Sequence, residues 1–269
     1  MKNRHTLILL CVLTPVCVMF RTIQLVFTID GATGFIKQQY TAISVLMTVI
    51  VCAAIASVAM LATSVDEIKE KPYGKHPAVA ITCVLAGGMF IYQTVAGMSV
   101  INAWYDVLLV LLTLVSVFVF VAYGLKNVYD YNFPDIMLIV PVLYYVVKLI
   151  SVFVSTSALS LVTENIFLIF TNSVLLWFMY EFASFENQIG DVAKKPKRLF
   201  SSGLAAVMLC AVTAIPRLVL MITGKMEITS GDVSAALLNI SIGLFIIAYI
   251  VSNFYNKDEI KKSTPKHLA

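Results

Sequence analysis

The sequence predicts an all-α protein, a polytopic transmembrane bundle of eight helices. Of its 269 residues, 60% are hydrophobic and 13% are charged, and the mean hydropathy is +0.91. A soluble domain averages about half apolar and about a quarter charged residues, so this composition indicates a membrane protein. The apolar runs are continuous and more than twice as long as a β-barrel strand of about ten residues, which predicts helices rather than strands.

A helix of about 20 apolar residues crosses the hydrocarbon core of a bilayer. By this measure the spans are residues 6–28, 41–64, 77–100, 103–123, 135–157, 164–186, 200–223 and 232–254. Short outer connections predict antiparallel hairpins within one domain, residues 1–269. The hairpins are residues 6–64, 77–123, 135–186 and 200–254, followed by a short cytoplasmic tail, residues 255–269.

The first span begins like a secretory signal, with a basic start and then an apolar run. Arg21 and Gln24 follow where small residues of a cleavage site would stand, so we expect an uncleaved first helix. The cysteines also lie in apolar spans and show no CxxC spacing, which predicts core packing and neither a metal site nor a cofactor. They are Cys11, Cys17, Cys52, Cys83 and Cys210.

The positive charges predict the orientation, because cytoplasmic loops carry an excess of Lys and Arg. Fourteen of the 19 lie on one side: Lys2, Arg4, Lys69, Lys71, Lys75, Lys126, Lys194, Lys195, Lys197, Arg198, Lys257, Lys261, Lys262 and Lys266. The opposite loops hold Lys37 and Lys225. We therefore expect both termini in the cytoplasm, and a location in a bacterial plasma membrane.

The first helix of each hairpin carries a helix-weakening residue followed by a long polar one. These combinations are Pro15 with Arg21, Gly87 and Gly88 with Gln93, Pro141 with Lys148, and Pro216 with Arg217. The first and third recur at offsets of 126 and 127 positions, which predicts a parallel repeat of two four-helix units. Interrupted helices in corresponding positions are typical of a transporter site, although bent helices without a transport role would look the same.

Three cations fall inside predicted spans, namely Arg21, Lys148 and Arg217. A charge at bilayer depth needs a partner or a wet cavity, and all three are expected in the outer half of the membrane. If they face one another, they form a basic cavity suited to an anion. The alternative is that each reaches the lipid headgroups or pairs with Asp106 or Glu164 to hold the bundle together.

The candidate ligand-binding residues share this outer level. They are Arg21, Gln24, Tyr92, Gln93, Tyr144, Tyr145, Lys148 and Arg217. In the inner half, Glu181 is a candidate proton carrier, while a carboxylate that bonds a neighbouring hydroxyl is the alternative reading.

Several chemistries are excluded by the residues present. His5, His76 and His267 are all predicted in the cytoplasm, so the spans hold no bis-His haem, HExxH zinc site or Ser-His dyad. No Gly-rich phosphate loop follows a strand, which excludes nucleotide hydrolysis of that type. The net charge of +4 lies in loops rather than on one face, so nucleic acid is not an expected partner.

The sequence therefore predicts a membrane protein that transports or binds a small anionic or zwitterionic solute through an outward-facing basic cavity. A second hypothesis is a sensor or accessory subunit that binds a ligand or lipid and acts through a protein partner or a homo-oligomer. A third is an enzyme acting on a lipid-phosphate headgroup. It is disfavoured, because only Asp106, Glu164 and tyrosines could serve as its base.

Overall fold

The computed structural model describes residues 2–28, 37–63, 76–98, 101, 103–129, 131–157, 163–189, 195–224 and 230–254. This part of the chain is helical and contains no strand. Its long helices are α1 (Lys2–Thr28), α2 (Thr41–Thr63), α3 (Pro77–Met98), α4 (Trp104–Lys126), α5 (Ile139–Ser157), α6 (Thr163–Glu186), α7 (Lys195–Ile222) and α8 (Ser230–Phe254). Short 3₁₀ turns, η1 (Gln38–Tyr40) and η2 (Asp135–Leu138), precede α2 and α5. All eight helices include a stretch long and apolar enough to span a membrane, which confirms the predicted fold class.

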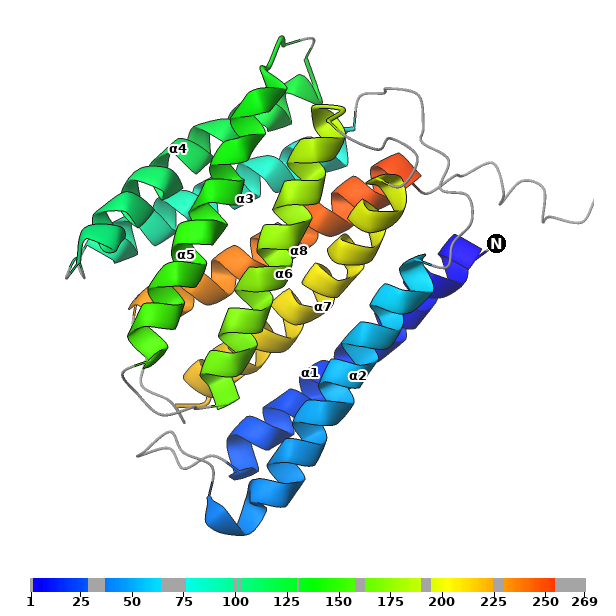
Figure 1. Ribbon diagram of the computed structural model, residues 1–269, viewed down its shortest axis with the longest axis vertical. Helices are drawn as coiled ribbons and strands as arrows, with labels where there is room; N and C mark the ends of the chain where they lie inside the picture. Colours follow the sequence, from blue (N-terminus) through cyan, green and yellow to red (C-terminus); the bar gives the residue numbers. More distant parts are fainter. Residues whose placement is uncertain are drawn as a thin grey trace, which may run out of the picture.

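Helices α3 to α8 form a closed ring, in which each packs on its neighbour in the chain and α8 packs back on α3 (Figure 1). The α1–α2 hairpin lies outside this ring, and both of its helices pack on α7. The middle of the ring is a packed aromatic core. Its contacts include Phe90 with Phe120 at 5.3 Å, Phe182 with Phe245 at 5.5 Å and Phe182 with Tyr249 at 4.9 Å between ring centroids.

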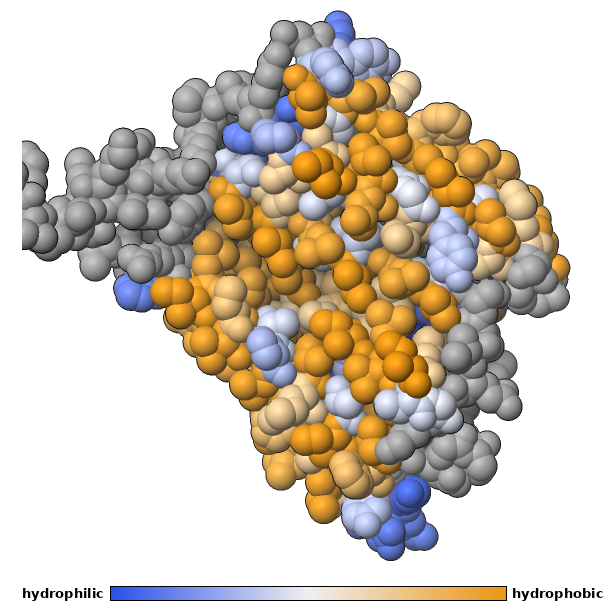
Figure 2. Space-filling view, turned by 180° about the vertical axis from the view of Figure 1, so that it is seen from behind, coloured by the Kyte–Doolittle hydropathy of each residue, from blue (hydrophilic) through white to orange (hydrophobic). Residues whose placement is uncertain are grey.

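The bundle presents an apolar surface between two more polar ends. Figure 2 shows hydrophobic residues over most of the visible face, with the most hydrophilic residues toward the extremities. Large apolar side chains such as Phe27, Met60 and Ile81 are more than 60% exposed, as expected of residues that contact lipid. Helix α1 begins and α8 ends at the same end of the bundle. We call this the inner end, because the charge pattern predicts that it faces the cytoplasm, and the opposite one the outer end.

Helix α7 is the central element, since it completes the ring and also carries the hairpin. Every residue from Leu199 to Cys210 is buried. Gly203 allows the closest approach: a Cβ atom there would lie 2.6 Å from Ile250 Cδ1 and 3.2 Å from Phe178 Cε2. Because both neighbours are themselves buried, they have little room to move aside.

We expect Gly203→Val to destabilise the protein by about 1–3 kcal/mol through overpacking. Gly88→Val is the matched control, because Gly88 is exposed and a Cβ atom there would meet nothing within 4 Å. The measurement is the apparent Tm of the purified proteins in one detergent. Equal Tm values for the two variants would contradict the assignment of Gly203 to a close helix contact.

The helix contacts do not support the predicted four-plus-four repeat. The α1–α2 hairpin lies outside the ring, whereas its expected counterpart, α5–α6, belongs to the ring.

Helix α7 begins at Lys195 rather than at residue 200, where the sequence predicted its start. Pro196 occupies its first turn, where a missing N–H breaks no helical hydrogen bond, so the basic run extends the helix instead of ending it.

The predicted helix-break residues differ in their surroundings. Pro15 is exposed inside α1 and Pro216 is buried inside α7. Pro141 instead lies in the first turn of α5, where proline is tolerated. A Cβ atom on Gly87 would lie 3.0 Å from Val121 Cγ2, so Gly87 serves the packing of α3 on α4. The predicted tail, residues 255–269, lies outside the described residues.

Candidate functional site: an arginine-lined cavity

Arg21 is directed into the protein rather than toward the headgroups. Its residue exposure is 3%, and its Nη1 donates a hydrogen bond to Gln24 Oε1 at 2.6 Å. Its guanidinium carbon also lies 4.2 Å from the centroid of the Phe167 ring on α6, a cation–π arrangement. The burial of Arg21 thus disfavours headgroup contact for this residue.

Gln24 holds Arg21 in place and joins the two helices of the hairpin. Its Nε2 donates to Ser44 Oγ at 2.8 Å and to Thr48 Oγ1 at 2.9 Å, both on α2. With its Oε1 accepting from Arg21, both ends of the buried amide have partners. Gln24 therefore acts as a positioning residue for the guanidinium.

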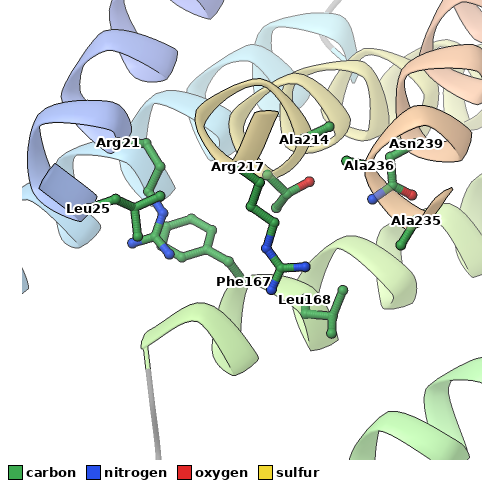
Figure 3. Close-up of a pocket in the computed structure, with 10 residues that line it drawn as sticks. Arg21, Leu25, Phe167, Leu168, Ala214, Arg217, Ala235, Ala236 and Asn239 are labelled. Carbon is green, nitrogen blue, oxygen red and sulfur yellow. The ribbon is translucent and has the colours of Figure 1, made fainter. Parts of the chain in front are cut away.

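Arg217 approaches the same region from α7, directly after Pro216. Its Nη1 lies 3.5 Å from Asp232 Oδ1 on α8, an ion pair that is partly exposed. Arg21 and Arg217 line one cavity, and both guanidinium groups are directed toward the Phe167–Leu168 segment of α6 (Figure 3). The other lining residues are Leu25, Thr213, Ala214, Ala235, Ala236 and Asn239.

The cavity has a volume of about 20 Å³, which is space for about one water molecule. Two guanidinium groups repel each other when they share a confined, mostly apolar space, and Asp232 offsets part of this charge. A carboxylate or phosphate oxygen between them would interact favourably with both. The arrangement is thus suited to an anionic group.

Lys148 lies on the buried face of α5, one turn beyond Tyr144 and Tyr145. It is half-buried and interacts electrostatically with Asp106, which attracts it, and with Arg217, which repels it. Lys148 does not line the cavity shared by Arg21 and Arg217. The structure thus brings two of the three predicted cations into one cavity and leaves the third nearby.

The remaining candidate ligand residues divide between the ring interior and the outer surface. Tyr144 and Tyr145 are buried, and the Tyr144 ring packs edge-on against Phe90 at 5.3 Å. Tyr145 Oη and Gln93 Oε1 are buried and have no hydrogen-bond partner within the described part of the chain. Tyr92 is 38% exposed and lies on the outward face of α3, away from the ring interior.

The acidic candidates serve mainly local contacts. Asp106 Oδ2 accepts a hydrogen bond from Ala103 N at 2.9 Å and so caps the start of α4. Glu181 is 5% exposed, and Trp177 Nε1 on the same helix donates to its Oε1 at 3.3 Å. The side chain of Glu164 lies outside the described residues.

The sequence reasoning missed a second polar cluster, at the inner end of the ring. Its central residue is Glu186, whose Oε1 accepts from Tyr123 Oη at 2.9 Å and from Tyr249 Oη at 2.7 Å. Lys126 Nζ lies 3.6 Å from Glu186 Oε2 and 2.5 Å from Asp135 Oδ1. We call these five residues the Glu186 cluster. Its signal in the sequence is a polar or aromatic residue near the inner end of each of the fourth, sixth and eighth spans.

Comparison of this chain with protein-family models, with curated proteins and with solved structures finds no match.

Proposed function

We propose that this chain, an integral membrane protein by its eight apolar helices, binds the anionic group of a small solute between Arg21 and Arg217 and transports the solute. The observation that carries the proposal is the shared cavity, to which two separate helices each contribute a guanidinium group. Lys148 adds positive potential near the site through its proximity to Arg217. A carboxylate or phosphate fits this donor set best.

The position of the cavity suggests how a solute would enter. The cavity lies where the hairpin meets the ring, between α1 on one side and α6, α7 and α8 on the other. At about 20 Å³ it accommodates no whole solute, so binding requires the walls to separate. In this proposal the hairpin moves against the ring. Its two helices move together, because Gln24 of α1 is hydrogen-bonded to Ser44 and Thr48 of α2.

The hairpin is fastened to the ring nearer the inner end, where Ser201 Oγ of α7 donates to Ala59 O of α2 at 2.9 Å. Rotation about this fastening would lift Arg21 away from Phe167 and open the cavity toward the outer end. Such rigid-body motion of one helix pair against a bundle is a common means of alternating access.

The experiment is a ligand-dependent thermal shift on the purified protein, with glutamate, succinate, inorganic phosphate and glycerol 3-phosphate as probes. We expect at least one of them to raise the apparent Tm of the wild type and of Arg198→Gln, an exposed arginine of α7 at the inner end. Arg21→Gln and Arg217→Gln should both lose the shift. The proposal fails if no probe shifts the wild type, or if both cavity variants respond as the control does.

Uptake then separates transport from binding alone. The active probe, radiolabelled, is offered to proteoliposomes containing the wild type, Arg217→Gln or Arg198→Gln. We expect accumulation with the wild type and the control and none with Arg217→Gln. Binding without uptake in the wild type would assign the chain to the sensor or accessory class instead.

A further inference from the structure

We propose that Glu186 is a proton-binding site that keeps the inner end of the ring closed while it is ionised and releases it when it is protonated. In a transporter, the proton bound at Glu186 would be the coupling ion, and only this role of the proton rests on the proposed function. The proton-controlled closure itself stands on the geometry of the Glu186 cluster.

The cluster joins alternate helices of the ring through one carboxylate. Tyr123 lies on α4, Glu186 ends α6 and Tyr249 lies on α8, so the two phenol hydrogen bonds converge on one oxygen from different helices. Both tyrosines are at most 3% exposed, and the Glu186 side chain is 9% exposed. The carboxylate is therefore the point at which α4, α6 and α8 are held together.

The charges of the cluster do not balance while both of its carboxyl groups are ionised. Within the described residues it holds one ammonium group and two carboxylates. Lys126 lies 2.5 Å from Asp135 but 3.6 Å from Glu186, so it compensates Asp135 more fully. A proton bound at Glu186 would make the three groups neutral in sum without moving Lys126 away from Asp135.

Protonation also weakens the contacts that close the inner end. A hydrogen bond to an ionised acceptor is roughly twice as strong as one between neutral groups. Neutral Glu186 would thus hold the phenols of Tyr123 and Tyr249 less strongly and lose its attraction to Lys126. Helices α4 and α8 would then be freer to separate from α6 at this end.

Other titratable groups face the cluster from the neighbouring elements. On α3, the buried thiol of Cys83 interacts electrostatically with Glu186. On α7, Lys195 Nζ donates to Ser184 O at 3.0 Å, two residues before the end of α6. Before α3, His76 N donates to Asn127 O at 3.1 Å, which places the backbone of this residue beside the end of α4. Because histidine titrates near neutral pH, the experiment has to separate it from Glu186.

Cys83 supplies a natural probe for the opening, since it is fully buried beside the cluster. In a parent protein with Cys11, Cys17, Cys52 and Cys210 replaced by alanine, the rate of Cys83 modification by 4,4′-dithiodipyridine reports access to the inner end. We expect Glu186→Gln, which mimics the protonated carboxyl, to raise this rate by about tenfold or more at pH 7.5 through local opening. Glu181→Gln, the other carboxylate on this part of α6, is the matched control and should leave the rate unchanged.

The pH dependence provides the second measurement, and it does not require Glu186→Gln to fold. The rate of the parent, divided by that of glutathione at the same pH, should rise as the pH falls. The rise should persist in His76→Gln. Where Glu186→Gln folds, its rate and the rate of the parent should converge at low pH. A parent rate that does not change with pH overturns the proposal, and so does a folded Glu186→Gln that reacts as slowly as the parent at pH 7.5. Because no solute takes part, this result is independent of whether the arginine cavity binds an anion.

Discussion

Replacing Lys126 by methionine is expected to destabilise the protein toward the lower end of the about 3–5 kcal/mol measured when one partner of a buried ion pair is removed. The lower end applies because the side chains of Lys126 and Asp135 retain 15% and 29% exposure. The loss arises from two carboxylates, Glu186 and Asp135, left without their ammonium partner. The measurement is the apparent Tm in detergent, together with the yield of monodisperse protein.

A second substitution tests the cause. Lys126→Met combined with Glu186→Gln removes one of the two uncompensated charges, so the double variant should be more stable than Lys126→Met alone. Lys197→Met is the control, because Lys197 lies near the same end on α7 and is outside the Glu186 cluster. If the two substitutions were simply additive and both destabilising, the interaction of Lys126 with Glu186 would have no energetic role.

Fastening the hairpin to the ring across the cavity is expected to lower solute uptake by about tenfold or more, because the binding-competent open state would no longer be populated. Leu25 of α1 and Ala236 of α8 line the cavity from opposite elements, which makes Leu25→Cys with Ala236→Cys the pair of choice. In a background without the native cysteines, a reducible bifunctional methanethiosulfonate joins them. Uptake into proteoliposomes is measured before and after addition of dithiothreitol.

Each single cysteine variant, treated with the same reagent, controls for modification of the cavity wall. These proteins should retain more uptake than the cross-linked pair, and reduction should restore the pair to the level of the untreated protein. Full uptake by the cross-linked protein would show that the hairpin does not have to move.

The fold class followed from the sequence because span length and composition are local properties. The sequence also identified Arg21 and Arg217 as costly charges within apolar spans, but it did not determine that they line one cavity. The assignment of Tyr92 to the site stays a prediction, and the structure places this residue on the outward face of α3, where it is 38% exposed. In a membrane the lipid-facing and core-facing sides of α3 are both apolar, so hydropathy alone does not indicate which way Tyr92 points.

Other features depend on how separate spans meet rather than on the residues of one span. The contact of α3 with α8 that closes the ring joins segments far apart in the chain, and no pattern within either span indicates it. Glu186 was overlooked because it stands at a helix end among ordinary loop charges. Its role depends on Tyr123 and Tyr249, which are 63 residues away on either side. Lys148 was expected at the same depth as the two arginines, but it does not line their cavity, because depth does not determine the direction of a side chain.

The attachment of the hairpin to α7 has a consequence for the order of assembly in the membrane. The first two helices leave the ribosome long before their main docking surface, which is synthesised only with residues 195–222. Until then they must persist in lipid as a separate pair, and the bonds from Gln24 to Ser44 and Thr48 satisfy the amide during this interval. A nascent chain that stops after α6 would therefore contain an inserted hairpin without its main docking surface, which α7 supplies before α8 closes the ring.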